Sequence, residues 1–157
     1  MSRAGFRPVT EFSAMRRTII LLAGLLGAAG AAHADSRFFC STDDNSARFT
    51  IESGFQDEAG HRLNHFRGAL IVKNNSVPEA FRKRVFDSSK LTNRWSHDGE
   101  LRLEIFDDGS EDAKDQSLSL VILAEGRGKN FSGTYGLMVS GDGKPFTASG
   151  KVSCGSK

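Results

Sequence analysis

Residues 130–154, NFSGTYGLMVSGDGKPFTASGKVSC, decide the fold of this chain. Apolar or small side chains alternate with polar ones from Phe131 to Val139 and again from Phe146 to Cys154. This period of two is typical of strands with one buried face. Between the two runs, residues 140–145 are rich in glycine and contain a proline, as tight turns are. The stretch therefore predicts a β-hairpin whose last inward position is Cys154.

The N-terminal segment has the three parts of a secretory signal peptide. A pair of arginines precedes an apolar run at residues 18–32, and small residues follow, ending at Ala34. The apolar run has about 15 residues, which is short for a membrane span of roughly 20 residues. We therefore expect cleavage after Ala34. Residues 1–34 then comprise an upstream extension and the signal peptide, and residues 35–157 form a single mature domain in the periplasm or the secreted space.

The loss of this leader changes the charge of the chain. The whole chain carries a net charge of +2, but its mature part holds 17 basic and 18 acidic residues, a net charge of −1. A protein that binds nucleic acid usually presents a basic surface, so we expect no nucleic-acid partner. The mature part retains 123 residues, enough for one domain with its own core.

The chain has two cysteines, and they lie close to the two ends of the mature domain. Two cysteines in an exported protein most simply form a disulfide, because the compartment is oxidising. We therefore expect a bond between Cys40 and Cys154 that ties the first strand to the last. A redox-active pair is the alternative, but the sequence has no Cys-x-x-Cys motif.

The rest of the mature chain repeats the strand pattern between turn signals. The segments that alternate are residues 37–42, 47–52, 62–73 and 100–106, and residues 116–125 predict a strand whose core is apolar on both faces. Residues 77–86 predict one short helix, with a strand as the alternative. Ser76 and Glu79 have the spacing of a capping box, and a proline lies between them.

This pattern predicts an all-β fold. About eight strands with one short helix and regular turns favour an antiparallel meander closed as a small barrel, and a β-sandwich is the alternative. The expected disulfide favours the barrel, because it brings the terminal strands together and so removes two sheet edges.

Residues that carry catalysis or bind metals are sparse. His97 and Glu100 are close in sequence at a predicted turn, and a small hydrolase that uses this pair is one hypothesis. His61 and His65 are four residues apart, a spacing that converges on a helix and not on the strand predicted there. The acidic residues 107–115 do not follow the order of a calcium-binding loop, and we interpret them as a solvated loop. We expect no cofactor, no metal and no catalytic site.

Two features indicate a binding patch. The basic run Arg82, Lys83 and Arg84 lies on the predicted helix, where it is either a solvated face or a surface for a partner. Several apolar side chains have the parity that points away from the core, and they form a binding surface if nothing covers them. These residues are Phe39, Phe106, Val121 and Leu123.

Three functions fit these observations. The first is a non-enzymatic binding module that contacts a protein partner. The second is a carrier of a small apolar ligand inside a lipocalin-like barrel, for which the glycines at 68, 133, 136 and 150 leave room. The third is the hydrolase with His97 and Glu100. We prefer the first, and we expect a monomer with no membrane span after signal cleavage.

Overall fold

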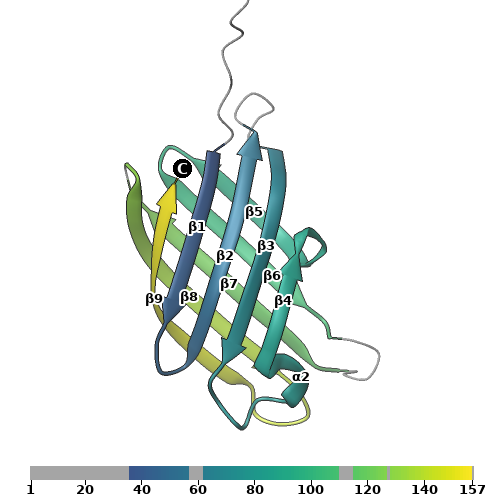
Figure 1. Cartoon of the computed structure of the whole chain (residues 1–157). Coiled ribbons are helices and arrows are strands. Elements are labelled where there is room, and N and C mark those ends of the chain that lie inside the picture. Colours follow the sequence, from purple (N-terminus) through teal and green to yellow (C-terminus); the bar gives the residue numbers. More distant parts are fainter. Residues whose placement is uncertain (1–35, 57–61, 110–114, 127, 157) are drawn as a thin grey trace, which may run out of the picture. The chain divides into compact units, whose positions relative to one another are not determined.

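A computed structural model describes residues 36–56, 62–109, 115–126 and 128–156. They form nine antiparallel strands in a nearly closed barrel, with one short helix (Figure 1). The strands are β1 (Ser36–Asp43), β2 (Ala47–Gln56), β3 (Arg62–Val72), β4 (Lys83–Asp87), β5 (Leu91–His97), β6 (Glu100–Asp107), β7 (Ser117–Glu125), β8 (Asn130–Ser140) and β9 (Phe146–Ser156), and the helical elements are α2 (Glu79–Arg82) and the 3-10 turn η2 (Ser88–Lys90). The predicted signal peptide lies outside the described residues.

The sheet order is β4-β3-β2-β1-β9-β8-β7-β6-β5, so sequence neighbours pair except β4 and β5, and the two terminal strands β1 and β9 meet. In Figure 1, β1 to β4 lie in front of β6 to β8, which cross them at a steep angle, and the end of β9 lies beside β1. Cys40 lies directly opposite Cys154 in the β1–β9 ladder, and the two form a disulfide. The predicted hairpin, the disulfide and the all-β barrel are confirmed.

The predicted short helix is present, but it fills only part of residues 77–86, and a strand forms the rest. The helix α2 covers only Glu79–Arg82, and β4 follows at once, which gives one strand more than predicted. The strand prevails because Phe86 enters the core while its backbone pairs with Gly68 of β3. The predicted capping box was wrong. Pro78 is the N-cap residue, no side chain caps the helix, and the Ser76 hydroxyl instead donates a hydrogen bond to the Asn74 side chain.

Large side chains fill the interior. Those less than 2% exposed are Tyr135, Phe49, Phe55, Phe81, Phe86, Leu70, Leu101, Leu103, Ile105, Leu118, Leu120 and Ile122. They come from both layers of the barrel and from α2, so one continuous core joins the front strands to the back strands. Burial of this apolar surface is the main force that stabilises the fold.

Three of the four glycines noted in the sequence have close neighbours. A Cβ at Gly68 would lie 2.3 Å from Ile51, and one at Gly150 would lie 2.7 Å from the ring of Tyr135. A Cβ at Gly133 would lie 1.9 Å from the backbone carbonyl oxygen of Leu123. Only at Gly136 does a Cβ meet nothing within 4 Å, and Gly136 has the exposed, outward parity of β8.

These contacts predict opposite effects for two similar substitutions in β8. Gly133→Ala should lower the free energy of unfolding by about 1–3 kcal/mol, because a backbone atom must move to admit the methyl group. Gly136→Ala should leave it unchanged or raise it by less than about 1 kcal/mol, because the methyl group enters open space and restricts the unfolded chain. Urea unfolding of the two variants measures both effects. Equal midpoints would contradict the close approach of β7 and β8 at Gly133.

The tyrosine beside Gly150 ties β8 to the turn between β1 and β2. Its ring packs edge-on against Phe49, at a centroid distance of 5.2 Å. Its hydroxyl donates a 2.6 Å hydrogen bond to Asp44, whose other carboxylate oxygen accepts from two backbone N–H groups of the turn. Burial raises the pKa of Tyr135 far above its ordinary value, and the bond to Asp44 adds to this rise. The hydroxyl is therefore a permanent donor.

A buried carboxylate joins the two edges of the sheet. The edge strands β4 and β5 do not pair, but Asp107 at the end of β6 accepts from both Nε, at 2.5 Å, and Nη2 of Arg84 of β4 at one carboxylate oxygen. It also accepts from Lys90 of η2 at 3.0 Å. Asp107 is 0% exposed, so the interpretation of residues 107–115 as a wholly solvated loop was wrong at its first residue.

Burial and ion pairing act in opposite directions on this carboxylate. Burial raises the pKa of Asp107, but the hydrogen bonds from Lys90 and Arg84 outweigh that effect and hold it below its ordinary value. Asp107 is therefore ionised in the folded protein at neutral pH. We call the gap between the unpaired edge strands β4 and β5 the seam of the barrel, and charge-assisted hydrogen bonds close it.

In the described part of the chain, none of the helices has the length and apolar character that a bilayer crossing needs. The Cys40–Cys154 bond is compatible with an oxidising, extracellular location.

Candidate functional site

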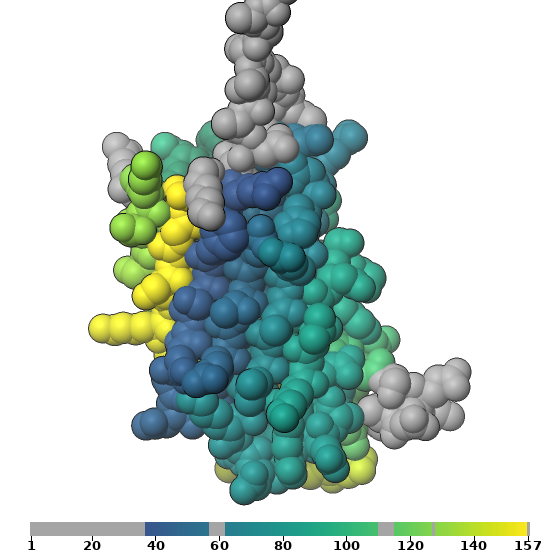
Figure 2. Space-filling model, in the orientation of Figure 1, coloured from purple at the N-terminus to yellow at the C-terminus, as the bar shows by residue number. Residues whose placement is uncertain are grey.

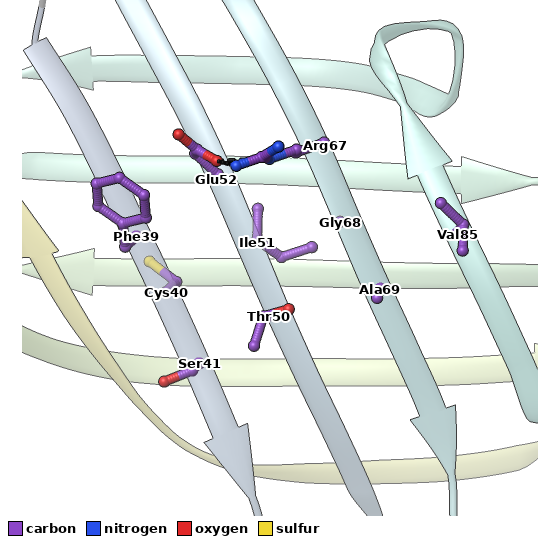
Figure 3. A pocket seen from close by; sticks show the side chains of 10 residues that line it. All are labelled: Phe39, Cys40, Ser41, Thr50, Ile51, Glu52, Arg67, Gly68, Ala69 and Val85. Atoms are coloured by element: carbon purple, nitrogen blue, oxygen red, sulfur yellow. Dashed lines mark hydrogen bonds and ion pairs between the residues drawn. The ribbon is translucent and has the colours of Figure 1, made fainter.

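A groove crosses the outer face of the front strands (Figure 3). The register places one outward residue of each strand in a single cross-strand row. From β9 to β4, the row consists of Ser153, Ser41, Thr50, Ala69 and Val85. Its first four side chains are small, so the row forms a trough. With strands about 4.8 Å apart, it is about 19 Å long. We call this row and the rows that flank it the outer groove.

Longer side chains wall the trough on both sides. Phe39, Glu52 and Arg67 form the next row toward one end of the strands, and Asp43, Arg48 and Ile71 form the next row toward the other. The central cavity, between Phe39 and Val85, has a volume of about 600 Å³. It continues beside Arg48 and Lys151 into a space of about 420 Å³, and beside His65 into one of about 430 Å³. Volumes of this size are typical of binding sites.

One wall of the groove is an ion pair with an unusually buried carboxylate. Glu52 is 8% exposed although it lies on the outer face, and Arg67 donates to it from Nε at 2.6 Å and from Nη2 at 2.5 Å. His65 Nε2 lies 3.7 Å from the same oxygen. Burial raises the pKa of Glu52, but the bonds from Arg67 outweigh it and leave the pKa below its ordinary value. The dashed lines of Figure 3 mark this pair.

The other wall is also fixed by ion pairs. Arg48 donates to Asp43 from Nε at 2.8 Å and from Nη2 at 2.6 Å, and Lys73 donates to it at 2.6 Å. These hydrogen bonds lower the pKa of Asp43 to about 2. Both walls therefore present fixed charges of both signs, while the floor between them is uncharged and carries the exposed hydroxyls of Ser41 and Thr50.

Figure 2 shows this face from outside, where the side chains of β1 to β4, in dark blue to teal, form the surface directly. The helix α2 contacts β3 and β4 and lies at one end of these strands in Figure 1, so it does not cover the trough.

A second surface lies on the outer face of the back strands. Phe106 is 43% exposed, Leu123 47% and Met138 45%, and the partly exposed Val121 lies between them in the sheet. We call these four residues the outer apolar stripe. The sequence predicted an exposed patch from the parity of Phe106, Val121 and Leu123 if nothing covers them, and no helix of the described chain packs on this face. Met138, which has the outward parity of β8, also belongs to this surface, although the sequence prediction did not include it.

The single tryptophan lies beside this stripe on β5. The Arg102 guanidinium lies over the Trp95 ring, 5.0 Å from its centroid, and the ring of His97 stacks against it at 6.5 Å. His97 pairs with Glu100 across the turn between β5 and β6, and the side chain of Glu100 lies 3.3 Å from Arg102. The pair of the hydrolase hypothesis therefore lies at an exposed hairpin end, where His97 faces solvent.

The structure does not bring the five residues of the predicted binding patch together. Phe39 belongs to the outer groove, and Phe106 lies on β6, with β9, β8 and β7 between their strands. The basic run is divided: Arg82 donates to the carbonyl oxygens of Val77 and Asn75, whereas Arg84 binds Asp107. Lys83 remains exposed.

The trough was missed because no single strand reveals it. Ser41, Thr50 and Ala69 are ordinary outward residues in their own segments, and only the strand register aligns them. One signal for the trough was available in the sequence. If Cys40 is placed opposite Cys154, the adjacent Ser41 and Ser153 also lie opposite each other, as two small outward residues on neighbouring strands.

Comparison with known proteins adds no identification at this point: no protein-family model matches the chain, and no curated protein or solved structure shows significant similarity to it.

Proposed function

We propose that this protein is an exported, non-enzymatic binding module that holds an extended segment of a partner protein in the outer groove. The observation that carries the proposal is the uncharged trough between two rows of ion-paired side chains. A solvated outer face of a sheet has no need for such a trough, because longer polar side chains would cover the strands equally well.

The chemistry of the groove fits a peptide chain. A length of about 19 Å accommodates about six residues of extended chain, each of which rises by roughly 3.3 Å. The hydroxyls of Ser41 and Thr50 can donate to and accept from backbone amides along the floor. The flanking ion pairs, Glu52 with Arg67 and Asp43 with Arg48, offer complementary charges to side chains of either sign.

The groove is also rigid before any ligand arrives. Its floor belongs to β1, β2 and β3, and the disulfide at Cys40 lies immediately beside Ser41. The hydrogen bonds between Glu52 and Arg67 hold the buried carboxylate in place, whereas Arg48 and Asp43 form an exposed pair. A preorganised site loses little conformational entropy on binding, which favours affinity.

The other two hypotheses have less support. Neighbouring atoms occupy the space beside Gly68, Gly133 and Gly150, and Gly136 faces outward, so these glycines leave no room for an internal ligand. For the hydrolase, His97 and Glu100 lie at an exposed hairpin end, where Glu100 borders a space of about 150 Å³, smaller than the spaces of the outer groove. Secretion through the N-terminal signal remains part of the proposal, and the disulfide fits it.

Photo-crosslinking tests the proposal. A short diazirine amino acid at position 69, on the floor of the groove, should give one discrete adduct with a second protein in the cell that makes this chain. The same probe at the exposed position 93 of β5 is the control and should give none. Thr50→Arg should abolish the adduct because the long side chain fills the trough, whereas His97→Ala should leave it unchanged.

The proposal fails if the probe at position 69 yields no more adduct than the probe at position 93. It also fails if Thr50→Arg, folded and oxidised, leaves the adduct in place. Loss of the adduct in the His97→Ala variant would transfer the site to the β5–β6 hairpin.

A further inference from the structure

The outer apolar stripe has a shape that is complementary to itself. Strands β7 and β8 are adjacent, and their outward residues pair in rows: Ser119 with Met138, Val121 with Gly136, and Leu123 with Thr134. Each row joins one larger side chain to a smaller one. A two-fold axis that runs along the strands between β7 and β8 would exchange the two strands, so each larger side chain would face the smaller one of a second copy.

The same axis also matches the next strands outward. β6 and β9 flank β7 and β8 at equal distance in the sheet order. Phe106 of β6 shares its row with Thr147 of β9, and Glu104 shares its row with Ser149. In the pair of copies, Phe106 would therefore face a threonine and Glu104 a serine.

The charged residues at the rim tolerate this arrangement. Lys151 of one copy would face Arg102 of the other, but Arg102 is paired with Glu100 and lies over Trp95. Glu104 of the second copy lies one row from Lys151, within reach of a lysine side chain. Because a rotation about an axis along the strands preserves their direction, the two sheets would pack in the aligned manner, about 10 Å apart.

From these relations we infer that two copies of this chain form a homodimer through the outer apolar stripe, with Val121 of each copy seated over Gly136 of the other. Self-association by an isologous two-fold contact is the commonest form of protein oligomer. The dimer leaves the groove floor on β1 to β4 free, and the two surfaces adjoin only at β9, where Lys151 borders both. The inference does not depend on the proposed function.

A membrane surface fits the stripe less well than a second copy. Glu100, Glu104 and Glu125 line the same outer face, and anionic lipid headgroups would repel them. Half-exposed Phe106, Leu123 and Met138, with Arg102 and Trp95 at the rim, instead match the residue types enriched in protein interfaces.

Exchange of the valine and the glycine at the contact between Val121 and Gly136 provides the test. Gly136→Val should abolish the dimer, since a valine would meet Val121 at both symmetric contacts. Val121→Gly should weaken it, since two glycines would meet there. An equimolar mixture of the two variants should form a heterodimer, because both of its contacts again join a valine to a glycine. Sedimentation equilibrium gives the mass of each species, and native mass spectrometry separates the heterodimer from homodimers.

Ala69→Val is the matched control, because it adds apolar surface to the opposite outer face, and it should leave the dimer unchanged. If Gly136→Val does not fold, Leu123→Glu decides the question, because this side chain is exposed and its charge should dissociate the dimer. A monomeric wild-type protein at every concentration, a dimeric Gly136→Val variant, or a mixture that forms no heterodimer would each overturn the inference.

Discussion

Replacement of both cysteines, Cys40→Ala with Cys154→Ala, is expected to lower the free energy of unfolding by about 4 to 5 kcal/mol. The bond joins residues 114 apart in sequence, so it restricts the unfolded chain strongly. The bond also reinforces the ladder between β1 and β9, which is the shortest in the described sheet. These two strands pair only over Phe38–Ser41 with Ser153–Ser156. A loss of this size is a large fraction of the stability of a typical domain.

Urea unfolding of the oxidised wild type and of the double variant measures this loss directly. Wild-type protein unfolded in the presence of a reductant is the control, because it removes the bond without a change of side chain, and it should match the variant. If the variant and the oxidised wild type unfold at the same urea concentration, the bond does not constrain the unfolded chain as the account requires.

The second large effect concerns the seam of the barrel. Asp107→Asn should lower the free energy of unfolding by about 3 to 5 kcal/mol, because it removes the buried carboxylate that Arg84 binds and leaves Lys90 with only the exposed Asp108. The neighbouring Asp108→Asn is the matched control. Asp108 also binds Lys90 but is largely exposed, so its removal should have little effect.

The difference in unfolding free energy between wild type and Asp107→Asn should also depend on pH. The pKa of Asp107 is lower in the folded state than in the unfolded chain, where it is about 3.9. Its contribution is therefore complete above the unfolded pKa and is lost as the pH falls through the folded pKa. The difference in unfolding free energy between wild type and Asp107→Asn should be constant near neutral pH and should shrink below about pH 4.

The other carboxylates titrate in both proteins and so cancel in this difference. A difference that stays constant down to pH 2, or that grows as the pH falls, would show that Asp107 is not the ionised partner that closes the seam. Guanidinium chloride is unsuitable as denaturant here because its salt screens the ion pairs.

The sequence was informative where structure is local. The hairpin of β8 and β9 follows from an alternation that needs no knowledge of distant strands, and two cysteines allow only one intramolecular bond. Together these features define the barrel, because a bond between the terminal strands leaves β4 and β5 as its only edges. The outward parity of Phe106, Val121 and Leu123 was equally readable, but their exposure was conditional, because the sequence does not show which face the short helix covers.

The features missed in the sequence depend on contacts between distant residues. Residues 83–87 form a strand because β3 offers an edge and Phe86 fills the core beside Gly68, and a five-residue segment carries no periodicity strong enough to predict this. Asp107 is the first member of an acidic run that is typical of solvated loops. Its burial depends on Arg84, which is 23 residues away in sequence.

The central claim is that side chains fill the barrel and that recognition takes place on its outside. Native mass spectrometry of the protein, purified from an oxidising compartment without denaturation, tests this claim most directly. The account predicts bare chains, as a monomer or a dimer, each two hydrogens lighter than the sequence because of the disulfide. An additional mass of a small molecule that is retained in the native spectrum and lost on denaturation would contradict the account and would favour an internal ligand.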